Sequence, residues 1–335
     1  MAMGNTAAVL TVFLFLWSLK SRGVLAVLPR LEYVPRKGDG SIAFLVVGDW
    51  GRKGHYNQSR VASQMGRVGE ELEIDFVVST GDNFYDDGLK SEDDAAFLQS
   101  YSKIYTARAL QEKPWFSVLG NHDYRGDVLA QLSPALRRID SRWLCLRSFV
   151  VDADVAELFF VDTTPFVSKY FTDTKDHKYD WRGVLPLNTY IAPLLKDLDS
   201  ALRESNAKWK ILVGHHPIRS VGHHGDTQEL IDQLLPILEA NNVDLYVNGH
   251  DHCLEHIKDT KSGIHYLTSG GGSKAWRGGF DIETELRGGL KFYHDGQGFM
   301  SVYATLFHIE VAFYDVSATI LHNFTLTNNP HYSLL

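Results

Sequence analysis

The sequence predicts an α/β protein in which two packed β-sheets are flanked by helices within a single domain. Two patterns predict this fold. Short apolar runs alternate with amphipathic helical stretches over most of the chain, and strand-like runs dominate its last part. No long linker, repeat or low-complexity run follows residue 40 of the sequence, so we expect one domain over residues 40–327. The apolar runs predict buried strands at Ile42–Val47, Ile74–Ser79, Trp115–Leu119, Glu157–Val161, Trp209–Val213 and Val243–Val247.

Helices are expected between these strands, and further strands after them. Two helices should begin at capping-box pairs, Ser91 with Asp94 and Asp226 with Glu229. Leucines and alanine at helical spacing over 194–202 predict another helix, and Pro236 must shorten or kink the helix in which it lies. The later strands are expected at Ile264–Thr268, Ser301–Phe307, Ile309–Tyr314 and Thr319–Leu326.

Composition narrows the function before any motif is considered. The 335 residues carry 33 Lys and Arg against 41 Asp and Glu, a net charge of −8, which disfavours a nucleic-acid partner. Fifteen His and only two Cys exclude a disulfide scaffold and a four-cysteine zinc site, but leave open a site of imidazoles and carboxylates. We expect Cys145 and Cys253 to be unpaired, although an oxidising compartment would permit a bridge.

The N-terminal segment predicts entry into the secretory pathway. The 13 residues from Ala7 to Leu19 carry no charge and are too few for a membrane span of about 20 residues. Val24 and Ala26 suit a cleavage site after Ala26, so residues 1–26 are predicted to be a signal peptide. An uncleaved signal anchor is the alternative, because no Lys or Arg precedes Lys20. Two glycosylation sequons, at Asn57 and Asn323, agree with an extracellular, apoplastic or vacuolar destination.

Five of the apolar runs end in glycine followed by a residue that can bind a metal. Glycine permits tight turns and close approach of the backbone. Because ligands of open α/β sheets bind outside the carboxyl ends of the strands, we expect the five ends to line one edge of a sheet and share a metal site. The pairs are Gly48-Asp49, Gly81-Asp82, Gly120-Asn121, Gly214-His215 and Gly249-His250.

Together these motifs, GDWG, GDNFY, GNHD, GHHP and GHDH, resemble those of the purple acid phosphatases within the calcineurin-like metallophosphoesterases. The resemblance runs from about Ile42 to Thr325. The chain is short and has no large additional N-terminal domain, and in this it resembles the small plant enzymes and the mammalian tartrate-resistant acid phosphatases. It implies a metallophosphoesterase catalytic domain with a dinuclear centre, Fe³⁺ plus one divalent ion, which is Fe²⁺, Zn²⁺ or Mn²⁺.

The resemblance also implies which residues hold the metals. The residues that match the ferric ligands are Asp49, Asp82, Tyr85 and His252, and those that match the divalent ligands are Asp82, Asn121, His215 and His250. Leu212 replaces the valine of the family's V-x-x-H pattern, which leaves a choice between His215 and His216. The family reads H-x-P here, so Pro217 favours His215.

Tyr85 carries a chemical argument of its own. Gly51 stands where ordinary metallophosphoesterases have a histidine ligand, and Tyr85 can fill that place. A phenol has a pKa near 10, so a phenolate at acid pH needs a strongly Lewis-acidic ion, which favours ferric iron. The alternative is that Tyr85 is an aromatic residue of the core.

The resemblance finally implies the reaction. His122 and His224 match the family's substrate-contacting histidines, and either can be the general acid; His224 could instead be an exposed loop residue, and His223 beside it leaves a register choice. The implied function is an acid phosphatase of broad substrate range that hydrolyses phosphate monoesters by attack of a metal-bound hydroxide, for phosphate acquisition or recycling. Its expected partners are small phosphate esters and inorganic phosphate, with no nucleic acid and no membrane span, in a monomer.

Three other functions stay open. A phosphodiesterase on the same scaffold would share every motif. An iron centre could also have peroxidase-like redox activity. A non-catalytic binding or storage glycoprotein would be expected to lack some of the seven ligand residues, and none of them is missing.

Overall fold

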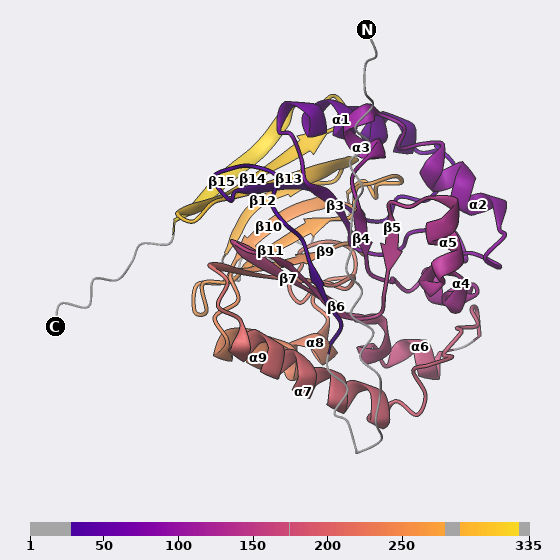
Figure 1. Ribbon diagram of the computed structural model, residues 1–335. Coiled ribbons are helices and arrows are strands. Elements are labelled where there is room, and N and C mark those ends of the chain that lie inside the picture. Colours follow the sequence, from indigo (N-terminus) through magenta and orange to yellow (C-terminus); the bar gives the residue numbers. More distant parts are fainter. Residues whose placement is uncertain (1–27, 174, 279–288, 328–335) are drawn as a thin grey trace, which may run out of the picture.

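The computed structural model describes residues 28–173, 175–278 and 289–327, which form two β-sheets packed face to face with helices outside them (Figure 1). The strands of the eight-stranded sheet, in spatial order, are β1 (Arg30–Glu32), β6 (Phe149–Ala153), β7 (Ala156–Phe160), β8 (Trp209–Val213), β9 (Leu245–Asn248), β11 (His265–Ser269), β10 (Leu254–Lys258) and β12 (Leu290–His294). Those of the seven-stranded sheet are β15 (Ile320–Thr327), β14 (His308–Asp315), β13 (Gly298–Ala304), β2 (Ile42–Val47), β3 (Phe76–Ser79), β4 (Trp115–Ser117) and β5 (Trp143–Cys145).

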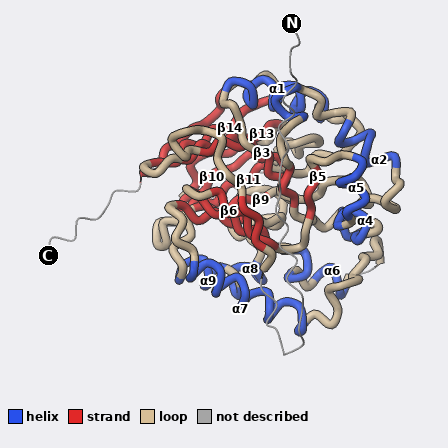
Figure 2. Tube along the Cα trace, viewed as in Figure 1, coloured by secondary structure: helices blue, strands red, loops and turns tan. Residues whose placement is uncertain are grey.

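Helices cover the outer face of each sheet, so the domain has four layers (Figure 2). Over the seven-stranded sheet lie α1 (Gln58–Glu71), α2 (Ala95–Phe97), α3 (Arg108–Gln111), α4 (Val128–Leu132) and α5 (Pro134–Ile139). The shorter α6 (Lys169–Thr172) precedes the helices of the eight-stranded sheet, which are α7 (Asn188–Glu204), α8 (Gln228–Gln233) and α9 (Leu235–Ala240).

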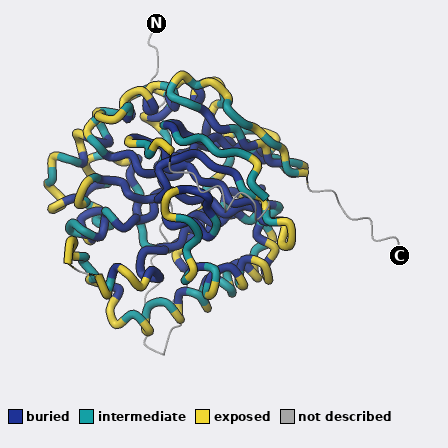
Figure 3. The backbone as a smooth tube through the Cα atoms, turned by 180° about the vertical axis from the view of Figure 1, so that it is seen from behind, coloured by how far each residue is buried: buried dark blue, intermediate teal, exposed yellow. Residues whose placement is uncertain are grey.

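Three apolar cores hold these layers together. The core between the sheets is formed by inward-facing residues such as Phe44, Phe76 and Phe160, and one further core lies under each set of helices. The buried residues therefore form the centre of the molecule (Figure 3). Because the central strands are covered on both faces, their sequences are continuous apolar runs rather than alternating ones.

The predicted fold class is confirmed, and so are most of the predicted strands. β2 and β8 have the predicted bounds. The helical segment is broken at Leu234, so that Pro236 lies in the first turn of α9.

Both predicted capping boxes are wrong. The N-cap of α8 is Thr227 rather than Asp226, and Ser91 does not cap α2. Asp94 is the N-cap, and its side chain accepts a hydrogen bond from the Ala96 N–H at 2.9 Å. The helix that follows is only one turn long before it widens into a π-helical turn at Leu98–Ser102.

The sequence led us to expect the five motif-bearing strands in one sheet, but they belong to two. β2, β3 and β4 are parallel neighbours in the seven-stranded sheet, whereas β8 and β9 are parallel neighbours in the other. Between β4 and β8 the chain crosses from one sheet to the other through β5, β6 and β7. The long interval between Asn121 and His215 in the sequence accommodates this crossing.

Both cysteines are buried and free, as predicted. The predicted signal peptide, residues 1–26, lies outside the described residues. Within the described part of the chain, no helix combines the length and apolar character needed to cross a membrane.

Candidate metal centre

The five glycine-containing motifs meet where the carboxyl ends of the two sheets come together. Asp49, Asp82 and Asn121 follow β2, β3 and β4, and His215 and His250 follow β8 and β9. All five residues are at least 95% buried. Each sheet thus contributes one side of the centre, with mostly oxygen donors from one sheet and mostly nitrogen donors from the other.

The Tyr85 hydroxyl stands at the middle of the oxygen side. It lies 2.8 Å from Oδ1 of Asp49, 2.9 Å from Oδ2 of Asp82 and 3.1 Å from Nε2 of His252. One phenolic proton can satisfy only one of these acceptors. The remaining lone pairs face one another in a buried space, which is the arrangement that a cation among them would stabilise.

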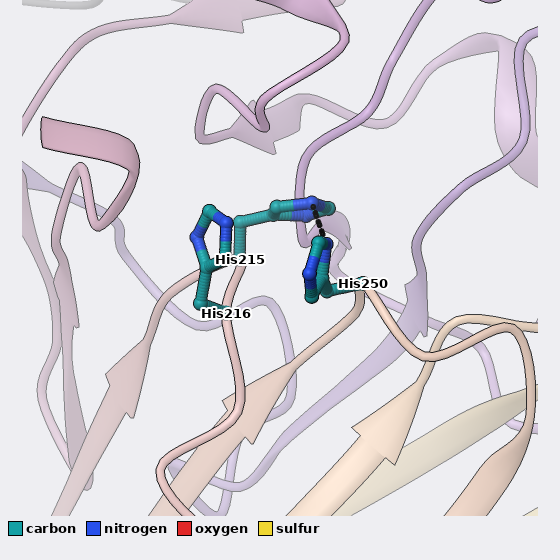
Figure 4. Close-up of side chains that lie close together, drawn as sticks. All are labelled: His215, His216 and His250. Atoms are coloured by element: carbon teal, nitrogen blue, oxygen red, sulfur yellow. Dashed lines mark hydrogen bonds between the residues drawn. The ribbon is translucent and has the colours of Figure 1, made fainter. Parts of the chain in front are cut away.

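The imidazole side is equally crowded. His215 Nε2 lies 3.2 Å from Asn121 Oδ1, 3.2 Å from His250 Nδ1 and 3.5 Å from Asp82 Oδ2. Its other nitrogen, Nδ1, lies 2.9 Å from the Thr80 carbonyl oxygen, which orients the ring. Figure 4 shows the rings of His215 and His250 facing each other from the ends of neighbouring strands.

His216 occupies a different position from its neighbour. Its Nδ1 lies 3.1 Å from the Thr163 hydroxyl and its Nε2 lies 3.0 Å from the Tyr170 hydroxyl. Its ring also packs on His250, with 4.3 Å between centroids. Although the nitrogens of His215, His216 and His250 are near enough to surround an ion, both nitrogens of His216 already have hydroxyl partners. The geometry therefore favours His215 as the ligand and His216 as a support for His250.

The backbone of the ligand loops is strained where it turns. Asp49, Asp82 and His250 have φ values of 62°, 50° and 69°, in the left-handed region that residues with a Cβ seldom adopt. Two hydrogen bonds between loops hold these turns: the His250 N–H donates to Asp49 Oδ2 at 3.0 Å, and the His122 N–H donates to Asp82 Oδ1 at 2.8 Å.

The glycines before two of the ligands are required by close packing between motifs. A Cβ on Gly120 would lie 2.2 Å from Asp82 Oδ1, and one on Gly249 would lie 2.4 Å from Asp49 Oδ2. Each glycine thus makes room for a carboxylate from another strand end. The Gly–ligand pattern of the sequence consequently reflects contacts across the centre as well as local turns.

Electrostatics divides the centre into charged and neutral groups. Burial favours the neutral form of Asp82, but His215 and His122 outweigh it and hold the pKa of this carboxyl well below its usual range. Burial also opposes a charge on His215, but Asp82 raises the pKa of this imidazole to about 9. Burial and the carboxylates of Asp49 and Asp82 raise the pKa of Tyr85 well above its usual value. A phenolate at Tyr85 would therefore require a strong cation in direct contact with it.

A cavity of about 290 Å³ is lined by four of the candidate ligands, Asp82, Asn121, His250 and His252. The His122 ring lines it, with Nε2 3.9 Å from Asp82 Oδ2, while His122 Nδ1 faces the Asp86 carbonyl oxygen. His224 also lines the cavity and stacks on His250 with 4.0 Å between ring centroids, whereas His223 is absent from the lining. The full lining is Asp82, Asn121, His122, Arg125, Lys169, Tyr170, His224, His250, His252 and Trp276.

Several residues that shape the centre were not singled out from the sequence. Asp123 is fully buried, and its carboxylate accepts the backbone N–H groups of Asn83, Phe84 and Gly120. It thereby ties the loops after β3 and β4 together. Its place in the GNHD motif was the available signal. Arg125, Lys169, Tyr170 and Trp276 also line the cavity, and no motif or spacing marks them in the sequence.

The two sequons lie on different kinds of backbone. Asn57 is half-buried and is the N-cap of α1 with a φ of 66°. Asn323 lies on edge strand β15 and is exposed.

Comparison with known proteins agrees with this fold and centre. Residues 42–254 match the calcineurin-like phosphoesterase family, so the chain is a member of that class. It is 63% identical to purple acid phosphatase 3 of Arabidopsis thaliana over 293 residues, which are 88% of this chain and 80% of that protein. It is 31% identical to tartrate-resistant acid phosphatase type 5 of Homo sapiens over 256 residues, 72% of this chain and 76% of that protein. Within the class, the chain belongs to the purple acid phosphatases.

Solved structures of other proteins share the fold. GAP50, described as the anchor in the inner membrane complex of Plasmodium, superposes with a TM-score of 0.69 at 24% identity, covering 86% of this chain and 89% of that one. The purple acid phosphatase PPD1 from yellow lupin seeds gives a TM-score of 0.62 at 15% identity, covering 87% of this chain and 54% of that one. At these identities the likeness extends to the fold alone.

Proposed function

We propose that this protein is an acid phosphatase that hydrolyses phosphate monoesters of broad range and serves phosphate acquisition or recycling. The observation that carries the proposal is that seven side chains able to bind metal come together from five strand ends in two sheets, and that four of them, Asp82, Asn121, His250 and His252, line one cavity. A storage or binding protein on this scaffold would not need a complete donor set.

We propose that the seven side chains hold two metal ions. Asp49, Asp82, Tyr85 and His252 would hold Fe³⁺. Asp82, Asn121, His215 and His250 would hold Fe²⁺, Zn²⁺ or Mn²⁺. The donor chemistry fits: the phenol among carboxylates suits a trivalent ion, and the imidazoles and amide suit a divalent one. When bound, the two ions neutralise the charge of the phosphate ester and supply the nucleophile at acid pH.

The chain's own residues would orient the ester and move a proton. His122 Nε2 and the His224 ring both face the cavity, where they can donate to the phosphoryl oxygens. His122 Nδ1 lies against the Asp86 carbonyl oxygen, which directs Nε2 towards the substrate. We assign to one of these two histidines the proton that the leaving alkoxide needs.

Phosphate release is the direct test. The purified protein should release phosphate from a chromogenic monoester at about pH 5. It should also contain iron and show a visible absorption band from Tyr85. A folded protein with neither iron nor activity would contradict the proposal. Parallel rates on a phosphodiester would separate the monoesterase from a diesterase.

We further propose that the protein is secreted or vacuolar, is cleaved after Ala26, is glycosylated at Asn57 and Asn323, and is a monomer. The uncharged segment before Ala26 and the two sequons support this proposal. Production in a secreting host, N-terminal sequencing and intact mass before and after deglycosylation would test it. Asn323 should be modified more completely, because it is exposed on an edge strand while Asn57 is half-buried.

A further inference from the structure

One wall of the cavity carries two cations that the proposed reaction does not use. Arg125 lies over the Tyr179 ring at 5.9 Å, the Tyr179 and Tyr170 rings are 5.1 Å apart, and Lys169 Nζ lies over the Tyr170 ring at 5.2 Å. We call these four residues the cationic wall. Arg125, Lys169 and Tyr170 line the cavity directly.

The two positive charges of this wall are not neutralised by ion pairs within the described part of the chain. Neither Arg125 nor Lys169 has a carboxylate within ion-pair distance among the described residues. The carboxylate of Glu229, which forms no ion pair with Lys169, accepts the Ser168 N–H at 2.9 Å. Nε of Arg125 is buried without a hydrogen-bond partner among the described residues. A buried donor of this kind is costly unless a ligand satisfies it.

The cationic wall contacts the candidate metal ligands through one intervening residue on each side, His122 on one and His216 on the other. Arg125 Nη1 is 3.0 Å from His122 Nδ1, and His122 borders Asp82. On the other side, Tyr170 contacts His216, which packs on His250. A phosphoryl group at the metal donors would therefore place its ester substituent beside the wall. Trp276, stacked on His252 with 4.0 Å between centroids, limits the same space.

We propose that Arg125 and Lys169 form a second anion subsite, so that the preferred substrates are small phosphate monoesters whose leaving group carries its own negative charge. This inference rests on the proposed phosphatase function and narrows it. Carboxylates and second phosphates are the relevant groups, because a guanidinium and an ammonium pair well with both. The cavity volume of about 290 Å³, at the low end for ligand pockets, favours small esters.

A matched pair of substrates tests the subsite. Glycerol 3-phosphate and 3-phosphoglycerate differ only in a hydroxymethyl group where the second has a carboxylate. The wild-type protein should have the higher kcat/KM for 3-phosphoglycerate. Lys169→Gln should reduce the ratio of the two kcat/KM values by roughly 1.5-fold to fivefold, as expected for an exposed ion pair. Adding Arg125→Gln should reduce the ratio further.

Two controls separate the subsite from general effects. Lys261→Gln lies in the turn between β10 and β11, at the end of these strands away from the centre, and should leave both kcat/KM values unchanged. Raising the salt concentration should lower the substrate ratio in the wild type, because it screens exposed charges. The effect should be smaller in Lys169→Gln and smallest in the double variant, which lacks both charges.

The outcomes are distinct. Equal kcat/KM values for the two esters in the wild type, or an equal loss on both in Lys169→Gln, would overturn the subsite while leaving the phosphatase intact. No phosphate release from either ester would instead contradict the proposed function. Lys169 is exposed, so its variant should fold even if Arg125→Gln does not.

Discussion

Two clusters of histidines in this protein have opposite chemistry. The metal centre places His215, His250 and His252 among carboxylates and a phenol. A second group, His256, His265 and His322, which we call the histidine cluster, lies where β10, β11 and β15 meet. There His256 Nδ1 is 3.0 Å from His322 Nε2, and His256 Nε2 is 2.8 Å from His265 Nδ1.

The neighbours of each cluster account for the difference. Around the histidine cluster pack Phe324, 4.0 Å from the His256 ring, and Phe292, 4.9 Å from the His322 ring. Burial and the adjacent His265 lower the pKa of His256 to about 2, whereas Asp82, against the effect of burial, raises the pKa of His215 to about 9. His215, beside Asp82, therefore lies in a site that attracts cations, whereas His256, between two imidazoles and a phenyl ring, stays neutral. The number of histidines in a sequence therefore says little until their neighbours are known.

The largest expected effect comes from removing a carboxylate of the metal centre. Asp82→Ala should lower kcat/KM by about a thousandfold or more and reduce the metal content, because this side chain borders both halves of the donor set. His256→Phe should keep both within about twofold. Metal analysis and steady-state kinetics on both variants would measure this contrast. A similar loss of activity in the two variants would refute it.

Tyr85 is the next test, because it separates metal binding from colour. Tyr85→Phe keeps the ring but removes the hydroxyl that lies between Asp49 and Asp82. We expect the visible band to disappear and kcat/KM to fall about tenfold. Tyr246→Phe is a suitable control, since its buried hydroxyl donates to the His216 carbonyl oxygen and not to the donor set. A visible band that persists in Tyr85→Phe would contradict the assignment of this phenol to the ferric ion.

The metal centre was largely predictable from the sequence, and the histidine cluster was not. The ligand candidates Asp49, Asp82, Asn121, His215 and His250 each follow an apolar run and a glycine, which is local information. The placement of these strands in two sheets was missed, because strand pairing depends on contacts between distant segments. The geometry favours His215 over His216 because the Thr163 and Tyr170 hydroxyls contact both ring nitrogens of His216. These contacts join distant segments, so no local pattern in the sequence reveals them.

His256, His265 and His322 have no ligand spacing, so they were given ordinary roles at the sequence level. Antiparallel pairing of β10 with β11 brings the first two together, and the packing of the second sheet adds the third. The error at Ser91 has a similar origin. Its spacing to Asp94 satisfied a local rule, but Asp94 itself caps the helix, through the Ala96 N–H.

Glu255 is a buried carboxyl group with no imidazole partner among the described residues, and its protonation can be compared with that of Asp82. Glu255 is 1% exposed, and its carboxyl lies 3.0 Å from the Ser220 hydroxyl. That hydroxyl has a single proton, which its 2.6 Å contact directs to Asp251, so the contact with Glu255 needs a proton on the carboxyl. Burial, together with the charge of Asp251, raises the pKa of Glu255 to about 8.

The sign of the resulting pH dependence is clear. Between the unfolded pKa of about 4.3 and the folded value of about 8, the folded protein binds more protons than the unfolded chain. The free energy of unfolding should therefore fall as the pH rises through this range. Glu255→Gln, which keeps the shape and can still donate to Ser220, should remove roughly 2–4 kcal/mol of that fall between pH 5 and pH 8. Chemical denaturation of both proteins at the two pH values would measure it. An unchanged fall would mean that Glu255 is ionised in the folded state.

The histidine cluster should give the smaller effect and the opposite sign. Burial, with His265 for the first and Lys258 for the second, lowers the pKa values of His256 and His265 to about 2 and about 4. Below the unfolded pKa of about 6.5, the unfolded chain binds more protons, so the free energy of unfolding should fall as the pH drops from 6.5 towards 4.5. His256→Phe, whose ring suits the pocket beside Phe324, should reduce this fall by roughly 1–2 kcal/mol. His55→Phe, in an exposed loop, should leave it unchanged. If His256→Phe left the fall in the free energy of unfolding between pH 6.5 and pH 4.5 unchanged, His256 would be protonated in the folded state. Neighbouring carboxylates would then not explain the difference between the histidine cluster and the metal centre.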